Sequence, residues 1–131
     1  SCSCSAPGEF DRFMRRGDTF IIDIVVPEDA CTPKNLTGFE VWFTAKEHYA
    51  VPDAQASIRL GTALPLTGVT ITSPFEGKVR IVIPAQATVN FPDTPMMLVY
   101  DVQLKEISTG RIFTVESGTL TVSPDVTRAI V

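Results

Sequence analysis

The chain contains one histidine, and this residue limits the acid–base chemistry that the sequence supports. His48 lies between Glu47 and Tyr49, just after a predicted strand. A nucleophilic triad needs a base beside the nucleophile and a third group that orients the base. The sequence has no G-x-S-x-G motif and no glycine-rich loop leading into a helix that would hold a phosphate. We therefore expect a surface histidine and a protein that is not an enzyme.

Carboxylic acids are the other groups that could perform catalysis. Glycoside hydrolysis needs two of them in one cleft, and the candidates are Asp23, Glu40, Asp101, Glu106 and Glu116. Three of these alternate with apolar residues on predicted strands, so we expect them to point outward. Their spacing places no two of them in one cleft. The pair Glu28-Asp29 is too sparse for a calcium loop.

The chain has three cysteines, Cys2, Cys4 and Cys31. An odd number argues against a complete disulfide framework. A zinc site needs four ligands close together, and His48 is remote from Cys2 and Cys4. We expect three free thiols in a reducing compartment, with no metal and no cofactor.

Composition excludes several classes of partner. The net charge is −4, from 11 basic and 15 acidic residues, and no basic face for nucleic acid is evident. Apolar runs such as residues 96–100 are far shorter than the roughly 20 residues of a membrane helix. The start of the chain lacks the apolar segment of a signal peptide.

The length of the chain, 131 residues, suits one domain. We predict this domain at residues 16–128, after a flexible lead-in at 1–15.

Apolar residues recur at every second position in seven short segments, which is the pattern of half-buried strands. Phe20, Ile22 and Ile24, for example, share one face of the first segment. The segments are residues 18–26, 38–47, 57–60, 68–72, 78–83, 96–106 and 111–122. Turn residues separate them, and Gly118 is the expected site of a bulge. The sequence therefore predicts an all-β, immunoglobulin-like antiparallel sandwich of about seven strands.

Two aromatic residues have more than one interpretation. Tyr100 follows a helical turn and Asp93, which suggests a tyrosine corner, but the loose spacing favours a core tyrosine whose hydroxyl finds a carbonyl. Trp42 falls on the mostly polar side of its strand. It covers a sheet edge, packs under the loop of residues 48–66, or contacts a partner.

Several short motifs follow one another in a characteristic order. They are RGDTF at 16–20, NLTG at 35–38, VWFTAK at 41–46, residues 77–88, YDVQL at 100–104, GRIFT at 110–114, SGTLTV at 117–122 and DVTR at 125–128. This ordered set resembles the small immunoglobulin-like domains of tailed bacteriophages and prophages, including domains like the N-terminal part of phage baseplate upper proteins. The resemblance covers about residues 16–128.

The resemblance implies a non-enzymatic virion component of the tail, baseplate or fibre, made in the bacterial cytoplasm. Its partners would be other virion proteins or further copies of itself. The candidate contact residues are Trp42, Tyr49, Ile130 and Val131. The alternative is a stand-alone binding module for carbohydrate or another surface ligand. Trp42 and Tyr49 would then form its aromatic platform.

Overall fold

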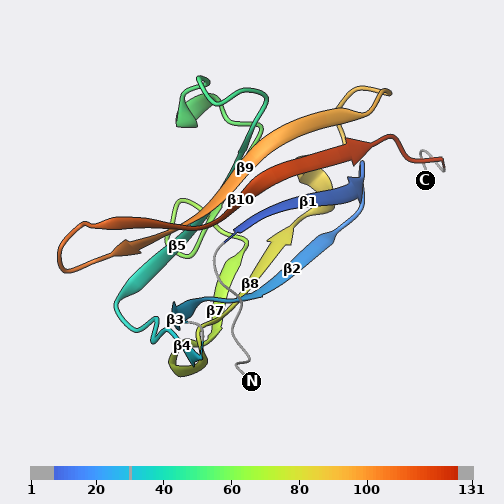
Figure 1. Cartoon of the computed structure of the whole chain (residues 1–131). Coiled ribbons are helices and arrows are strands. Elements are labelled where there is room, and N and C mark those ends of the chain that lie inside the picture. Colours follow the sequence, from blue (N-terminus) through green and yellow to red (C-terminus); the bar gives the residue numbers. More distant parts are fainter. Residues whose placement is uncertain (1–7, 30, 127–131) are drawn as a thin grey trace.

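Two β-sheets packed face to face form the fold (Figure 1). The structure, a computed structural model, describes residues 8–29 and 31–126. The larger sheet has the order β1 (Gly8–Arg15), β10 (Ile112–Ser123), β9 (Met96–Glu106), β5 (Phe39–Lys46) and β6 (Ile58–Gly61). The smaller sheet has the order β2 (Phe20–Val25), β8 (Lys78–Ile83) and β7 (Val69–Ser73). The predicted all-β sandwich is confirmed.

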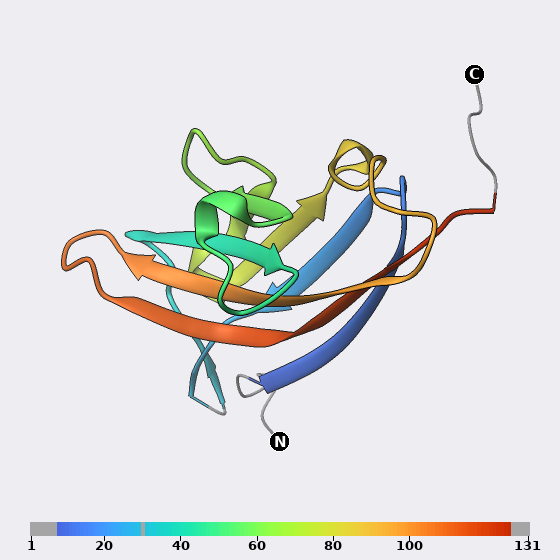
Figure 2. The same cartoon turned by 90° about the horizontal axis from the view of Figure 1, so that it is seen from above.

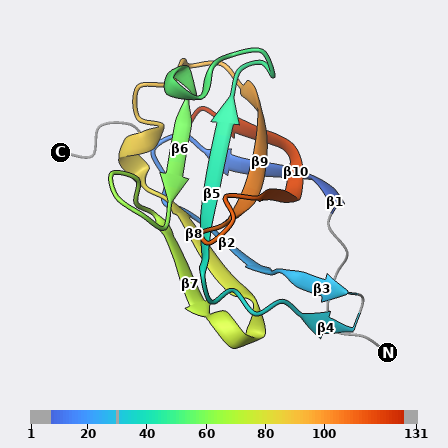
Figure 3. The same cartoon turned by 90° about the vertical axis from the view of Figure 1, so that its left-hand side faces the viewer.

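Short elements connect the strands of the two sheets. A two-stranded ribbon of β3 (Pro27–Asp29) and β4 (Thr32–Pro33) lies at one end, as Figure 3 shows. Three 3₁₀ turns interrupt the loops, namely η1 (Asp53–Gln55), η2 (Pro74–Glu76) and η3 (Ala85–Ala87). The last of these is the helical turn that the sequence predicted.

The core is the layer between the sheets, and every second side chain of each strand fills it. On β9 the buried side chains are at every second position, from Leu98 to Leu104. The side chains that are almost fully buried include Ile22, Leu36, Val41, Phe43, Val79, Ile81, Ile83, Leu98, Val102, Leu104 and Leu120. Burying one such side chain contributes roughly 1.5–3 kcal/mol. Figure 2 shows the larger sheet curving past β2 and β8 to enclose this layer.

Residues 8–15 differ from the expected flexible lead-in, because they form strand β1. This strand pairs in parallel with β10, from Gly8 opposite Glu116 to Arg15 opposite Ser123. Its core-facing positions are Phe10, Arg12 and Met14. An arginine in the middle of this face hides the apolar alternation, which is why the strand was not predicted. The rest of the lead-in, residues 1–7, lies outside the described residues.

The predicted bulge at Gly118 is wrong, and the glycine has another role. The register between β9 and β10 shifts between Thr114 and Glu116, so Val115 is the extra residue. At Gly118 the backbone of Phe10 on β1 crosses so closely that a Cβ atom would overlap the Phe10 carbonyl oxygen. Glycine therefore permits β1 to pair with β10.

We expect the substitution Gly118→Ala to detach β1 and to lower the free energy of unfolding by more than about 3 kcal/mol. Gly110→Ala is a matched control, since Gly110 also has a positive φ but has no atom within 4 Å of a built Cβ. The control should lose only about 1–2 kcal/mol. Urea denaturation and amide hydrogen exchange of residues 8–15 measure both. Equal losses in the two variants would contradict the close approach.

Candidate functional site

Two neighbouring hollows lie on the outer face of the larger sheet, the face that points away from β2, β8 and β7. The first has a volume of about 270 Å³ and the second about 390 Å³. Thr44, Asp53 and Gln103 line both of them. The two hollows therefore form one continuous depression across β5 and β9.

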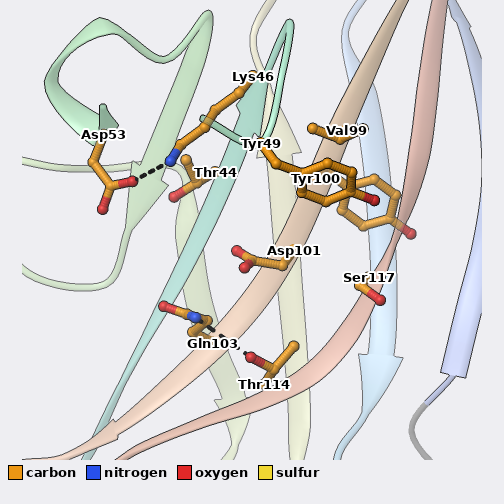
Figure 4. Close-up of a pocket in the computed structure, with 10 residues that line it drawn as sticks. All are labelled: Thr44, Lys46, Tyr49, Asp53, Val99, Tyr100, Asp101, Gln103, Thr114 and Ser117. Carbon is orange, nitrogen blue, oxygen red and sulfur yellow. Dashed lines mark hydrogen bonds and ion pairs between the residues drawn. The ribbon is translucent and has the colours of Figure 1, made fainter. Parts of the chain in front are cut away.

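Strand register assembles the floor of the first hollow, which we call the Tyr49 hollow (Figure 4). Asp101 on β9 lies directly opposite Thr44 on β5 and Ser117 on β10. One pair along, Gln103 lies opposite Thr114 and donates a long hydrogen bond of 3.4 Å to its hydroxyl. Thr44, Asp101, Gln103 and Ser117 face outward because their strand neighbours are buried, and Thr114 meets Gln103 on the same side. The floor is therefore polar, with Asp101 at its centre.

The loop between β5 and β6 forms the wall of the Tyr49 hollow. The ammonium group of Lys46 binds the carboxylate of Asp53 in η1, at an Nζ–Oδ1 distance of 2.6 Å. This ion pair holds the loop against the end of β5. Tyr49 extends from the loop over β9, beside Val99, and is 80% exposed. An accessible aromatic ring therefore stands over the polar floor.

Asp101 is the carboxylate on this floor that has no hydrogen-bond donor among residues 8–29 and 31–126. Partial burial raises the pKa of Asp101, and the negative charge of Asp53 raises it further. The positive charge of Lys46 acts in the opposite direction. Because no described donor bonds to the Asp101 carboxylate, this group is able to accept hydrogen bonds from a ligand.

Trp42 lines the second hollow and is packed against its surroundings. It lies opposite Gly61 in the β5–β6 pairing, where a built Cβ would be 3.1 Å from the indole Cδ1. The ammonium group of Lys105 lies 5.6 Å from the ring centroid, a cation–π geometry. The loop residues Leu64 and Leu66 line the same hollow. The indole thus lies against the adjacent strand and shares the hollow with the loop residues.

The predicted site residues have different outcomes. Trp42 and Tyr49 lie on the same outer face, in neighbouring hollows. Their role as partner contacts stays a prediction. Ile130 and Val131 lie outside the described residues. Sequence reasoning did not predict that the polar group Asp101 would lie beneath Tyr49, because the loop of residues 48–66 has no clear periodicity.

The remaining chemical candidates are distributed over the surface. His48 is exposed at the start of the β5–β6 loop. Asp23 pairs with Arg80 at 2.8 Å on the smaller sheet, and Glu106 pairs with Arg111 at 2.9 Å near the β9–β10 turn. Within the described part of the chain, no three His, Cys, Asp or Glu side chains are grouped to hold a metal ion. None of its helices is long and apolar enough to cross a membrane.

Glu116, one of the candidate carboxylates, is buried between the sheets. Arg12 donates to its Oε2 through Nε at 2.9 Å, and the Tyr100 hydroxyl donates to the same oxygen at 2.6 Å. Arg12 also donates to the Tyr100 hydroxyl at 3.0 Å. Tyr100 is therefore a core tyrosine, as one interpretation predicted, but its hydroxyl bonds to a carboxylate and not to a carbonyl. Counting back by twos from Leu120 would have placed Glu116 inward.

Cys31 is disulfide-bonded, so the expectation of three free thiols is wrong for this residue. An odd number of cysteines excludes complete pairing but allows one bond. Its backbone N–H also donates to Oδ1 of Asp29 at 2.9 Å, which orders the turn after β3. Cys2 and Cys4 lie outside the described residues.

Comparison with known proteins gives a structural likeness and no match in sequence. No protein family and no curated protein sequence matches the chain. Among solved structures, the N-terminal domain of phage TP901-1 ORF48 is similar, with a TM-score of 0.46 and 15% sequence identity. The alignment covers 95% of this chain and 93% of that chain.

We expect the cluster of Arg12, Tyr100 and Glu116 to act as a unit. Glu116→Gln leaves the partly buried Arg12 without a counter-charge and should lower the free energy of unfolding by about 2–3 kcal/mol. Tyr100→Phe should remove about 1 kcal/mol. The double variant should lose at least about 0.5 kcal/mol less than the sum. Glu106→Gln, which breaks an exposed pair, is the control and should have a much smaller effect. Additive losses in a double-mutant cycle would refute the coupling.

We also expect the stability to fall at alkaline pH because of Tyr100. Burial raises the pKa of Tyr100 above its usual value of 10, and its hydrogen bond to Glu116 adds to this. The unfolded chain releases this proton at a lower pH than the folded chain, so the contribution is present below about pH 10 and is lost as the pH rises further. Denaturation midpoints from about pH 9 to 11 should fall more steeply for the wild type than for Tyr100→Phe. Parallel curves would show that Tyr100 is not responsible.

Proposed function

We propose that the chain is a non-enzymatic building block of a phage or prophage particle, in its tail, baseplate or fibre. It works through contacts with other virion proteins or with further copies of itself. The ordered motifs along residues 16–128 support this function. The observation that carries it is an exposed apolar patch on the outer face of the larger sheet.

The strand order supports an immunoglobulin-like assignment for this building block. In immunoglobulin domains one sheet contains strands G, F and C, and the other contains strands B, E and D. In chain order, β10-β9-β5 and β2-β8-β7 occupy the corresponding places. We propose a single domain that includes β1, which pairs with β10 at the edge of the larger sheet.

Two large apolar side chains form the patch, which we call the Phe13–Met97 patch. Phe13 on β1 and Met97 on β9 both lie opposite Thr121 on the intervening strand β10. Phe13 is 68% exposed and Met97 is 65% exposed. Single exposed apolar residues are common, whereas two that flank one position of a solvent-facing sheet support a contact with another protein.

The edge strand β1 borders this patch. In the described part of the chain it is the last strand of the larger sheet, so one row of its backbone groups has no strand partner. Open edges associate readily with other chains unless they are protected. The charged side chains of Asp11 and Arg15, on either side of Phe13 along the strand, limit such pairing. The patch therefore gives the contact its energy, and the charged edge restricts which partner fits.

Replacing both apolar residues of the patch tests the proposal. The double variant Phe13→Ser/Met97→Ser should keep the circular dichroism spectrum of the wild type, because both side chains are exposed. It should weaken association at least about tenfold, as each large anchor contributes 1 kcal/mol or more. The assays are light scattering for self-association and co-purification with the products of the genes that flank its own.

Leu64→Ser is the matched control, since Leu64 is 84% exposed but lies outside the patch. It should associate as the wild type does. If the double variant also associates like the wild type, the patch is not the contact. If the wild type binds neither itself nor the products of the flanking genes, the assembly function is refuted.

A further inference from the structure

The Tyr49 hollow combines hydrogen-bond donors and acceptors within one small space. Its acceptors are the Asp101 carboxylate and the hydroxyl groups of Thr44 and Ser117. Its donors are the Lys46 ammonium and the Gln103 amide, and hydroxyl groups are able to act in either sense. A ligand that satisfies this set must itself offer both donors and acceptors.

The charges of the hollow disfavour an anionic ligand. Lys46 and Asp53 form an ion pair at 2.6 Å and largely neutralise each other. The negative charge of Asp101 then repels an anion. Hydroxyl groups donating to Asp101 would supply the hydrogen bonds that this partly buried carboxylate lacks.

Tyr49 adds an apolar surface to this polar floor. Its side chain projects over β9 from the wall of the hollow, with Asp101 below it (Figure 4). A tyrosine offers an apolar ring with a polar tip, and 80% of this one is exposed. A ligand with hydroxyl groups around its rim and C–H groups on its face matches the arrangement. The volume of about 270 Å³ is near the lower limit of small-molecule sites.

We infer that the Tyr49 hollow binds one ring of a neutral carbohydrate. Asp101 and Gln103 would hold its hydroxyl groups, and Tyr49 would cover its C–H face. This activity goes beyond the assembly role. Trp42 would contribute less than Tyr49 to ligand binding, because Gly61 and Lys105 already lie against its ring.

Saturation-transfer difference NMR on the whole chain tests this site. The probes are the methyl glycosides of glucose, galactose, rhamnose and N-acetylglucosamine, with methyl glucuronide as the anionic comparison and methylguanidinium as the cationic one. At least one neutral glycoside should bind, and the two charged probes should not. Tyr49→Ala and Asp101→Asn should each weaken that binding at least about tenfold, which is the effect of losing one strong contact.

Phe75→Ala is the matched control, because Phe75 is an aromatic residue that is 74% exposed on η2, remote from the hollow in sequence. It should bind like the wild type, and thermal melts should show that all variants are folded. Several outcomes would overturn the inference: no neutral glycoside binds, methylguanidinium binds instead, or Trp42→Ala alone abolishes binding. Failure here is distinguishable from failure of the assembly function, which the Phe13–Met97 patch variants measure separately.

Discussion

The whole structure depends on a dry layer between two sheets, in which a polar group is tolerated only when it is fully paired. Strands β5, β8 and β9 satisfy this constraint with apolar side chains at every second position. At one side of the layer, three polar side chains from three strands satisfy it in another way. Arg12, Tyr100 and Glu116 bond to one another, and no described buried side-chain nitrogen or oxygen lacks a hydrogen bond.

This polar cluster also specifies how β1 joins the sheet. A slip of β1 by one residue would turn Arg12 outward and Phe13 inward. Glu116 would then lose its positive counter-charge, and both Glu116 and the Tyr100 hydroxyl would lose a hydrogen-bond donor. Because both groups are buried, this loss would strongly destabilise the fold. The passage of Phe10 over Gly118 fixes the same register through steric fit. Together these contacts keep Phe13 on the outer face, where it and Met97 flank Thr121 in the proposed contact patch.

The sequence predicted the fold where the two-residue period is regular. The residues expected for β9 and β8 agree with the observed bounds, and β2, β5, β6, β7 and β10 differ by two residues or fewer at each end. Prediction failed where one residue breaks the period. Arg12 concealed β1, and the bulge at Val115 interrupts the alternation of β10, so that local periodicity did not show that Glu116 is buried.

The candidate site was less accessible to sequence reasoning than the fold. Trp42 and Tyr49 were identified from their type and exposed positions. Their relation to Asp101 depends on the register of β5 with β9 and on a loop held by the Lys46–Asp53 ion pair. Neither the register between two strands nor the path of a loop follows from local periodicity. A single acidic residue on a strand therefore gave no sign that it lies at the centre of a hollow.

The two proposed functions are compatible because one strand carries both sites at different positions. Met97, Val99 and Asp101 are successive outward residues of β9. Met97 belongs to the Phe13–Met97 patch, and Asp101 lies in the Tyr49 hollow. Four residues of extended strand separate their Cα atoms by roughly 13 Å. A partner that approaches from the β1 side and reaches only as far as Met97 would cover the patch and leave open the part of the hollow over β5. The outer face of one sheet thus has room for an assembly contact and a small ligand at once.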